Sequence, residues 1–386
     1  MTQFKPTQIL HYSKSAERHS DENIYWKQLV SAVTVSEFGA VTSVDFSPTQ
    51  PHYLAATSSA KVQIYDPLSL NIHRTLARFK QTALGGSFRH DGQLLAAGGQ
   101  DARVRLFLPE TKSQLRLFRG HKGAVHSVKF QCNQNGLVSF GDDQVVRRWD
   151  IAEEKQLGSQ KGHSDYVRCG ATGFSNENLI VSGSYDKTVR VWDARSKEET
   201  ACLSHGHPVE ALVLFPNDML IASAGGTLLK IWDLTSTGRL LCQLSAHHKT
   251  ITCLALGSNN RRLLSGSLDK HLKIYNTANY QLVHSLDFAA PVLSLGYSPD
   301  EQLLAVGMSD GSLAMHRRNA TDQADLEMAE QRRLRRDLTH RYALQTDHEQ
   351  QATTLILDPQ NDAKLQPYDQ QLTKFNYSRA LDIVLR

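Results

Sequence analysis

One sequence motif recurs along this chain at nearly constant intervals. The stretch "GSYDKTVRVWD" (Gly183–Asp193) returns more loosely as "GGQDARVRLF", "GDDQVVRRWD" and "GSLDKHLKIYN". Aligned on the aromatic position of the phrase, seven anchor residues stand 40 to 43 residues apart: Tyr65, Phe107, Trp149, Trp192, Trp232, Tyr275 and His316. A catalytic motif normally occurs once, so a phrase repeated at a fixed spacing indicates a repeat architecture.

Each repeat unit contains short segments with the patterns of β-strands. About ten residues before each anchor lies an apolar run ending in small residues, such as "LLAAGG" or "LIVSGS", and earlier lies an alternating segment such as "AVTSVDFSP". Period-two alternation with β-branched residues favours strands. A period of about 40 to 45 residues with G-H and W-D marks is typical of a propeller blade. The seven anchors therefore predict an all-β, seven-bladed propeller.

The beginning of the repeat region is predicted to close the ring. The last unit runs out after "SLAMHRRNA" without an outer strand, whereas "YWKQLVSAVTVSEF" precedes the first unit with a strand-like run. Because an open propeller would expose sheet edges, we expect Trp26–Val35 to form the outer strand of the final blade. The expected domains are an N-terminal extension (1–24), the propeller (25–318, with the closing strand in 25–36), a charged linker (319–364) and the start of a C-terminal helical domain (365–386).

The last of these segments is predicted to be helical. In "LQPYDQQLTKFNYSRALDIVLR" the apolar residues recur at spacings of three to five, as on one face of an amphipathic helix. The pattern stops at Arg386 without a capping residue, and we expect the helical domain to be truncated there. An uncovered apolar face implies a partner protein or a chain that continues.

Polar residues at fixed offsets from the anchor predict one hydrogen-bonded chain in several blades. A histidine stands near the beginning of the unit at an almost constant distance from the anchor, a serine stands ten positions before the anchor, and an aspartate stands six before it. Since buried polar groups are costly unless paired, we expect Asp to bind His, His to bind Ser, and Ser to bind the anchor. The expected network residues are His121, Ser139, Asp143 and Trp149; His163, Ser182, Asp186 and Trp192; and His247, Ser265 and Asp269. Around Trp232 we expect a broken network, because Gly226 and Ala222 occupy the Asp and Ser positions.

These networks have the composition of a hydrolase triad, but their repetition favours a structural role. A hydrolase remains an alternative that would need a pocket residue outside the repeated set, and none stands out in the sequence. The 17 histidines form no cluster at metal-ligand spacing, and the glycine pairs do not fit the phosphate-binding pattern G-x-x-x-x-G-K-[ST]. The sequence predicts no catalytic residue, metal, cofactor or small-molecule substrate.

Membrane and disulfide-rich classes are also excluded. No apolar run approaches the roughly 20 residues of a membrane helix. The five cysteines include no C-x-x-C pair and are expected to be buried, reduced thiols of an intracellular protein: Cys132, Cys169, Cys202, Cys242 and Cys253.

The formal net charge of +4 permits contact with nucleic acid. A basic residue two positions before five anchors is expected to line a solvated flank of the blades, with a nucleic-acid-binding stripe as the alternative: Arg105, Arg147, Arg190, Lys230 and Lys273. Candidates for a partner or a phosphate backbone are Arg74, Arg78, Lys80, Lys122, Tyr166, Arg168, Tyr185, Lys249 and Lys270. The run "QRRLRRDLTHR" adds Arg332, Arg333, Arg335 and Arg336, either as a solvated linker or as a nuclear-targeting or RNA-contacting patch.

The repeats with their G-H and W-D marks identify the chain as a WD-repeat protein. Particular loop strings resemble one family more closely: "EFGAVTSVDFSP", "KGHSDYVRCG", "GHPVEALVLFP", "HHKTITCLAL", "RLLSGSLDK" and "YDQQLTKFNYSRALDIVL". They are similar to the family of the fifteenth U-three protein, the WD-repeat subunit of the UtpA subcomplex of the small-subunit processome. The resemblance runs from about Tyr25 to Arg386.

This resemblance implies a nucleolar, non-catalytic scaffold that assembles with other UtpA-type subunits on pre-ribosomal RNA. It implies a role in 18S rRNA maturation and a further role in rDNA transcription. The alternative from another class is a substrate receptor of a cullin ubiquitin ligase. "WDAR" (Trp192–Arg195) fits the W-D-x-R pattern of such receptors, although the repeat itself already supplies two of these four residues.

Overall fold

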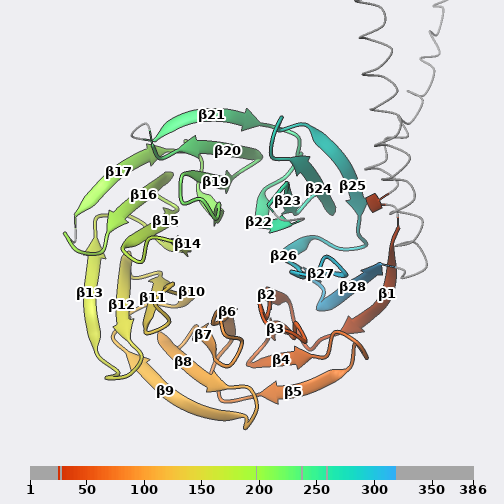
Figure 1. Ribbon diagram of the computed structural model, residues 1–386, viewed down its shortest axis with the longest axis horizontal. Helices are drawn as coiled ribbons and strands as arrows, with labels where there is room; N and C mark the ends of the chain where they lie inside the picture. The colour runs from red at the N-terminus through yellow and green to blue at the C-terminus, as the bar shows by residue number, and fades with distance from the viewer. Residues whose placement is uncertain (1–24, 27, 197, 236–237, 258–259, 319–386) are drawn as a thin grey trace, which may run out of the picture. The chain divides into compact units, whose positions relative to one another are not determined.

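The computed structural model describes residues 25–318 apart from 27, 197, 236–237 and 258–259. These residues form twenty-eight strands in seven four-stranded sheets, numbered here as blades 1 to 7. The blades follow one another in a ring (Figure 1), and their innermost strands line a central channel. The all-β, seven-bladed propeller is therefore confirmed. The charged linker and the helical region predicted after residue 318 lie outside the described residues.

Blades 1 to 4 each run outward from the channel through four consecutive strands. They consist of β2 (Val41–Phe46), β3 (Leu54–Ser58), β4 (Lys61–Tyr65) and β5 (Ile72–Leu76); β6 (Ala83–Phe88), β7 (Leu95–Gly99), β8 (Arg103–Leu108) and β9 (Ser113–Arg119); β10 (Val125–Phe130), β11 (Gly136–Gly141), β12 (Val145–Asp150) and β13 (Gln156–Lys161); and β14 (Val167–Thr172), β15 (Leu179–Ser184), β16 (Thr188–Asp193) and β17 (Glu199–Ser204).

Blades 5 and 6 repeat this order, and blade 7 takes its outer strand from the other end of the chain. They consist of β18 (Val209–Leu214), β19 (Leu220–Gly225), β20 (Leu228–Asp233) and β21 (Arg239–Leu244); β22 (Ile251–Gly257), β23 (Arg262–Ser267), β24 (His271–Asn276) and β25 (Leu282–Asp287); and β26 (Val292–Tyr297), β27 (Leu303–Met308), β28 (Ser312–Arg318) and β1 (Leu29–Ser36).

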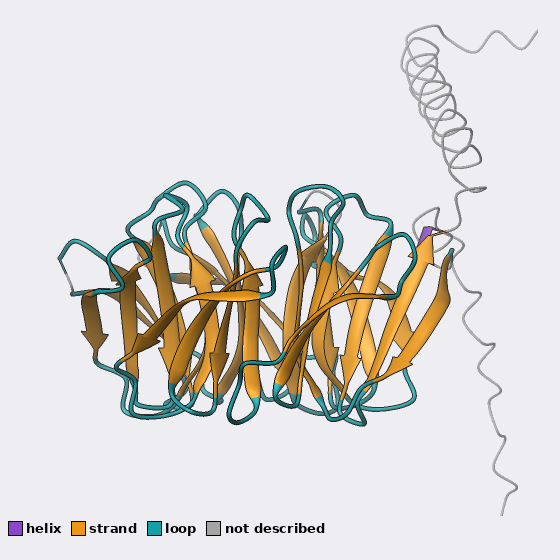
Figure 2. Ribbon diagram, turned by 90° about the horizontal axis from the view of Figure 1, so that it is seen from below, coloured by secondary structure: helices purple, strands orange, loops and turns teal. Residues whose placement is uncertain are grey.

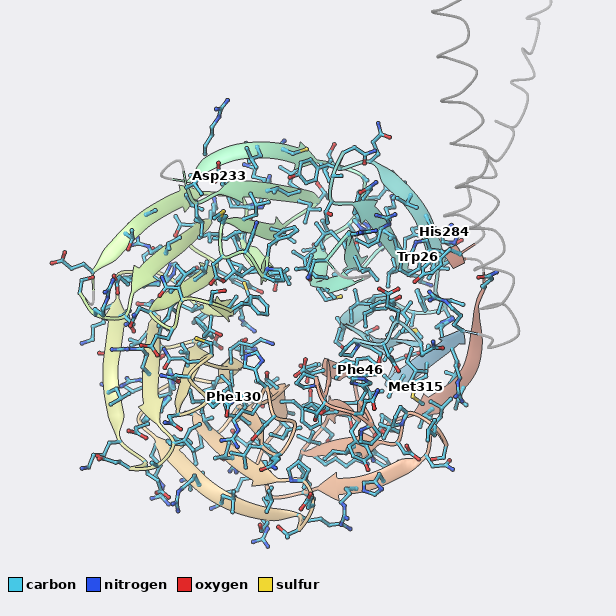
Figure 3. The ribbon with its side chains drawn as sticks, viewed as in Figure 1. Trp26, Phe46, Phe130, Asp233, His284 and Met315 are labelled. Carbon is cyan, nitrogen blue, oxygen red and sulfur yellow. The ribbon has the colours of Figure 1, made fainter. Side chains whose placement is uncertain are left out.

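The ring is closed by the antiparallel pair of β1 and β28. Leu29 lies opposite Arg318 and Ser36 opposite Ser312. The strand begins at Leu29, later than the Trp26 expected from the sequence. Trp26 instead lies in a short helical turn before the strand, where only 1% of its surface is exposed (Figure 3). This segment therefore contributes both a strand and a buried aromatic anchor.

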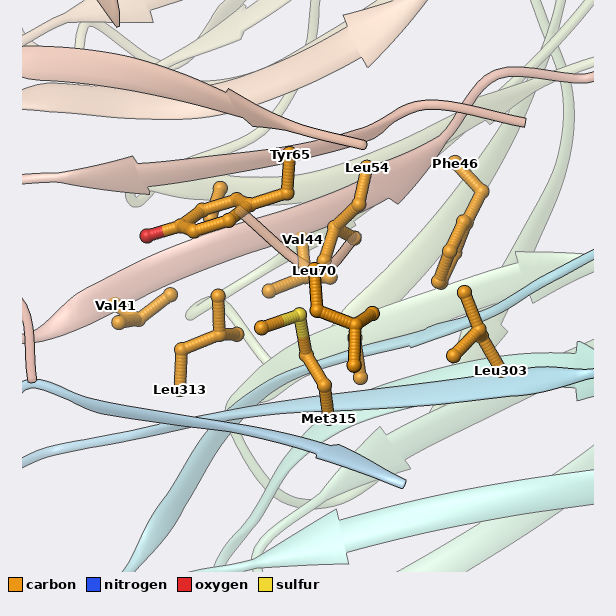
Figure 4. Packing of buried hydrophobic residues seen from close by; sticks show 11 residues of the cluster. Val41, Val44, Phe46, Leu54, Tyr65, Leu70, Leu303, Leu313 and Met315 are labelled. Atoms are coloured by element: carbon orange, nitrogen blue, oxygen red, sulfur yellow. The ribbon is translucent and has the colours of Figure 1, made fainter. Parts of the chain in front are cut away.

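The hydrophobic core lies between neighbouring blades. Figure 4 shows one such cluster, in which Val41, Val44 and Phe46 of blade 1 meet Leu303, Leu313 and Met315 of blade 7. The second strand of each blade is covered on both faces, which explains why these strands read as continuous runs of apolar and small residues. Burying one large apolar side chain stabilises a fold by about 1.5–3 kcal/mol, so each blade depends on its neighbours for much of its stability.

The propeller has two faces of loops, on either side of the strands (Figure 2). We call the side on which the inner strands begin the start face and the opposite side the end face. The start face carries the loops that connect one blade to the next and the turns between the second and third strands. Backbone hydrogen bonds join the two sets: Ala83 donates to Ser59 at 2.7 Å and Tyr185 donates to Tyr166 at 2.9 Å.

Candidate functional site

The polar chain around Trp149 is complete and buried. The Trp149 indole N–H donates to Ser139 Oγ at 2.8 Å, and Ser139 Oγ lies 2.6 Å from His121 Nε2. His121 Nδ1 lies 2.8 Å from Asp143 Oδ1. One proton arrangement satisfies all of these contacts: Nδ1–H donates to the carboxylate and the serine O–H donates to Nε2. Each group therefore has a partner away from water.

Two further blades repeat the chain with nearly equal distances. His163 lies 2.7 Å from both Ser182 and Asp186, and the Trp192 indole donates to Ser182 at 2.8 Å. In blade 6, His247 lies 2.7 Å from Ser265 and 2.9 Å from Asp269. The network residues that the sequence pointed to are thus brought together in each of these three blades.

The electrostatics of these chains suit a structural role. Burial alone would raise the pKa of Asp143, but its hydrogen bond to His121 and the charge of that histidine outweigh burial and lower the pKa to about 2. The pKa of Asp269 is likewise about 2, through His247 and two backbone N–H groups. Burial lowers the pKa of His163, which favours the neutral ring that accepts from serine. The carboxylates of these chains are therefore ionised, and burial favours the neutral ring at His163 and His247.

The serine of each chain is poorly placed to act as a nucleophile. Ser182 has no exposed surface, and its O–H is directed at His163 while its Oγ accepts the Trp192 N–H. A hydrolytic serine must reach a substrate carbonyl and must give its proton to the histidine during attack. Because the indole and the histidine both occupy this hydroxyl inside the sheet, the geometry favours packing over catalysis.

In the blade around Trp232, the residue expected at the serine position of the network is wrong. The serine of this blade is Ser223, to which the Trp232 indole donates at 2.8 Å; Ala222 does not occupy the serine position. The turn between β19 and β20 is one residue shorter than in blade 4, so counting back from the anchor misses Ser223 by one residue.

The same blade contains a histidine that the sequence reading missed. His205 is fully buried, and its Nε2 lies 3.3 Å from the carbonyl oxygen of Ser223. Its Nδ1 has no hydrogen-bond partner among the described residues, since Gly226 replaces the aspartate. Burial and the nearby Lys230 lower the pKa of His205 to about 4. This network is therefore incomplete, as expected, although it retains its histidine and its serine.

Blade 1 uses a carboxylate where other blades use histidine. Glu37 precedes the anchor Tyr65 by the same distance along the chain that separates His121 from Trp149. Its carboxylate accepts hydrogen bonds from the Tyr65 O–H and from Ser58 Oγ, the latter at 2.9 Å, and lies 3.6 Å from Lys61 Nζ. Burial and the bond to Glu37 raise the pKa of Tyr65. The offset alone would have found Glu37.

Blades 2 and 7 place aromatic rings at this same offset from the anchor. In blade 2 the residue is Phe79, and the centroids of the Phe79 and Phe107 rings are 5.6 Å apart. In blade 7 it is Phe288, and the rings of Phe288 and His316 meet edge to face at 5.5 Å. A polar residue at this offset thus accompanies a tryptophan or tyrosine anchor, whereas phenylalanine accompanies Phe107 or His316.

The basic residues two positions before the anchors do not form a solvated flank, contrary to the sequence expectation. Arg105 is 2% exposed and pairs with Asp101, and its guanidinium lies 4.8 Å from the Phe79 ring centre. Lys230 Nζ donates to the backbone carbonyl of His205 at 2.8 Å. Strand alternation correctly predicted that these side chains lie on the same face of each strand, but neighbouring loops cover that face. The other members are Arg147, which pairs with Asp143, Arg190, which pairs with Glu199, and Lys273, which donates to the Ala246 carbonyl.

Most of the candidate contact residues share the start face. They lie in its loops and turns or at the beginning of an inner strand: Arg78, Lys80, Lys122, Tyr166, Arg168, Tyr185, Lys249 and Lys270. Arg74 does not belong to this set, because it lies on the outer strand β5 and donates to His73. The four arginines of the run, Arg332, Arg333, Arg335 and Arg336, lie outside the described residues.

Three of these candidates converge at one point of the start face. The Arg168 guanidinium lies 5.7 Å from the ring centre of Tyr166 and 5.0 Å from that of Tyr185, close enough for cation–π contact. Arg168 also lies 2.9 Å from His126 Nε2 and 3.4 Å from Asp142. This cluster joins blades 3 and 4 and holds the arginine in a fixed position.

The cluster borders the mouth of the central channel. A cavity of about 470 Å³ runs between the inner strands, and its lining includes His126, Arg168 and Glu210, the latter hydrogen-bonded to Tyr185 at 2.6 Å. Within residues 25–318 as described, no group of three His, Cys, Asp or Glu side chains is placed to hold a metal ion. No helix of the described part is long and apolar enough to cross a membrane. All five cysteines are unpaired; Cys169 and Cys253 are buried as expected, whereas Cys132 and Cys242 are half-buried and Cys202 is exposed.

Comparison with known proteins agrees with the repeat assignment. Residues 112–150, 154–193, 238–276 and 280–316 match the model of the WD domain, G-beta repeat. The chain is 42% identical over 386 residues to the U3 small nucleolar RNA-associated protein 15 homolog of Xenopus laevis, in a match that covers 100% of this chain and 74% of that protein. The human homolog is 41% identical with the same coverage.

A more distant relative extends the match beyond vertebrates. U3 small nucleolar RNA-associated protein 15 of Schizosaccharomyces pombe is 36% identical over 366 residues, 94% of this chain and 74% of that protein. The resemblance first seen in the loop strings is confirmed, and the chain belongs to the family of U3 small nucleolar RNA-associated protein 15.

Proposed function

We propose that this protein is a non-catalytic nucleolar scaffold of ribosome biogenesis, acting in the small-subunit processome during maturation of 18S rRNA. The single observation that carries the proposal is the extent of the similarity. Relatives named for association with the U3 small nucleolar RNA match all 386 residues at 42% identity, so the likeness includes segments outside the propeller. A role in rDNA transcription belongs to the same proposal.

The geometry of the propeller supports a scaffold. Its repeated Ser, His and Asp residues are committed to one another within the sheets, and the closed ring presents two broad faces of short loops. A rigid surface of this kind can hold several partners at fixed positions. The proposed partners are UtpA-type processome subunits and pre-ribosomal RNA, the latter contacted through its phosphates.

The proposed domain organisation assigns separate tasks along the chain. Residues 25–318 form the propeller, preceded by an extension at 1–24. Residues 319–364 serve as a charged linker, and 365–386 belong to a helical region that joins the other subunits. Within the linker, the run Arg332 to Arg336 contributes to nucleolar retention or RNA contact, since arginines bind phosphate in a sequence-independent way.

Affinity purification of the tagged full chain with RNA retained tests this function. The expected result is co-purification of processome proteins and pre-ribosomal RNA. Alanine at Arg332, Arg333, Arg335 and Arg336 is expected to weaken the RNA recovery while the propeller stays folded. Recovery of neither processome proteins nor pre-ribosomal RNA would overturn the proposal.

The same purification separates the scaffold from the cullin ligase receptor. In the W-D-x-R pattern, the Arg195 side chain is 74% exposed and pairs at 3.1 Å with Asp193, the last residue of β16. If the chain instead recovers a ligase adaptor, and Arg195→Ala abolishes that recovery, the receptor function is correct. Under our proposal, Arg195→Ala leaves the recovered proteins and RNA unchanged.

A further inference from the structure

The start face carries a set of exposed cations around the ring. They lie in loops between blades or in turns between the second and third strands, and each is exposed. None of them takes part in an ion pair with another described residue. The set is Arg78, Lys80, Lys122, Lys187, Lys249 and Lys270.

Five carboxylates of the start face are largely buried, with side chains 2–11% exposed. Asp101 pairs with Arg105, and Asp143, Asp186 and Asp269 each bind the histidine of their network. Glu37 is buried beside Lys61. Asp165 and Asp310 instead accept hydrogen bonds from a backbone N–H and from Ser312. The outward charge of this face is therefore dominated by its lysines and arginines.

The end face has the opposite character. Exposed glutamates occupy its loops, and two of its cations, Lys155 and Arg195, are paired at 3.1 Å with Glu153 and Asp193 of the same face. The exposed glutamates are Glu110, Glu153, Glu154, Glu177 and Glu198. A modest net charge thus conceals two faces of different sign, and a polyanion would be attracted to the start face.

The start face also presents aromatic rings to solvent. Phe38 lies in the loop from β1 to β2 and is 91% exposed, and Tyr166 is 46% exposed beside Arg168. Flat rings among cations suit a strand of RNA, because its bases stack on aromatic side chains while its phosphates meet lysine and arginine. An acidic protein segment would satisfy the cations but has no regular supply of flat groups for the rings.

We propose that the start face is the surface on which this protein binds single-stranded RNA. The cations hold the phosphates, and Phe38 stacks on a base at the junction of blades 7 and 1. The inference rests on the proposed association with RNA and adds which face makes the contact. It also implies that the acidic end face remains free for protein partners.

Two variants of equal charge test the assignment. The start-face variant combines Arg78→Glu, Lys80→Glu, Lys122→Glu and Lys249→Glu. The end-face control combines Lys112→Glu, Lys155→Glu, Arg195→Glu and Arg261→Glu, all at exposed positions. Binding of the purified full chain to a labelled single-stranded RNA is measured by anisotropy between about 50 and 200 mM salt, the range over which phosphate contacts weaken steeply.

The start-face variant is expected to lose more than about tenfold in affinity and to depend less on salt, because fewer counterions are released. The end-face control is expected to stay within about twofold of the wild type, since distant charges are screened. Phe38→Ala is expected to lose roughly tenfold while keeping the wild-type salt slope, because stacking involves no counterion release.

Equal losses in the two charge variants, or no loss in either, would overturn the face assignment. Poly-glutamate binding as tightly as the RNA would show that the face takes an acidic protein instead. If the purified chain fails to bind RNA but still recovers pre-ribosomal RNA from cells, this inference fails and the scaffold function stands. If the cellular recovery fails as well, the proposed function fails with it.

Discussion

At the residue scale, one position near the beginning of each unit decides how the blade supports its anchor. That side chain is histidine beside tryptophan in blades 3, 4 and 5 and beside tyrosine in blade 6, glutamate beside Tyr65, and phenylalanine beside Phe107 and His316. Polar members of this series bring partners that satisfy them, whereas the phenylalanines need none. In this chain the polar residues at this position occur beside tryptophan or tyrosine anchors, and the phenylalanines occur beside Phe107 and His316.

The aspartate of a complete network is expected to stabilise the fold. Asp186→Ala would leave the buried His163 without an acceptor for its Nδ1–H and should lower the free energy of unfolding by about 1–3 kcal/mol. Asp310→Ala is the matched control: this aspartate occupies the same turn position, but its blade has Phe288 in place of the histidine. Chemical denaturation measures both, and equal losses would contradict a special role for the network.

The incomplete network of blade 5 is expected to be sensitive to acid. The pKa of His205 falls from its ordinary 6.5 to about 4 in the folded chain. Between these values the unfolded chain binds a proton that the folded chain does not, so stability is full above about pH 6.5 and declines as the pH falls toward 4.

Denaturation at a series of pH values tests this in His205→Gln. The variant should lose stability less steeply than the wild type between pH 6.5 and 4, by up to about 3 kcal/mol over the range. Parallel curves for the two proteins would mean that His205 does not contribute to acid sensitivity.

Counting from the anchor predicted the complete networks but not the exceptions. His121, Asp143 and their counterparts fall at fixed offsets because the turns of those blades have nearly equal length. Ser223 was missed since a shorter turn moves it by one residue, and Glu37 because a carboxylate replaces the expected histidine. Offsets are thus reliable only where turn length and chemistry are both kept.

At the element scale, the segment before β1 fastens the ring. Trp26 packs with Leu29 and with residues of blades 6 and 7, and the Arg318 guanidinium lies 3.7 Å from the ring centre of Tyr25. The Tyr25 O–H donates to Glu301 at 2.6 Å. The first and last described strands are therefore joined by side chains as well as by their backbone ladder.

Removing the aromatic anchor of this segment should destabilise the whole propeller. Trp26→Ala is expected to cost about 3–5 kcal/mol, because it empties a fully buried site and loosens the strand that covers β28. Phe38→Ala, a nearby aromatic truncation at a site 91% exposed, should change stability by less than about 0.5 kcal/mol. Thermal melts compare them, and similar shifts would show that the closing segment contributes little.

Strand order and closure could be anticipated from pattern, whereas exact bounds could not. The repeat length and the missing outer strand indicated which segment completes blade 7. The start of β1 depends on tertiary packing, since Trp26 is drawn into the core between blades and the strand begins only at Leu29. Local alternation carries no information about that competition.

At the scale of the whole molecule, the ring sorts charge by face. Residues far apart in sequence, such as Arg78 and Lys270, come to the same face because every unit places its connecting loops there. The sequence revealed the basic residues but not their convergence, which requires the strand directions. Repetition that first serves stability thus also creates one continuous surface for a partner.

The most direct test of the scaffold function is depletion of the protein with re-expression of defined variants, followed by quantification of mature ribosomal RNAs. Depletion is expected to lower 18S rRNA while the large-subunit rRNAs stay comparatively intact. Re-expression of the wild-type protein should restore 18S rRNA. Normal 18S rRNA after depletion would contradict the assignment to small-subunit biogenesis.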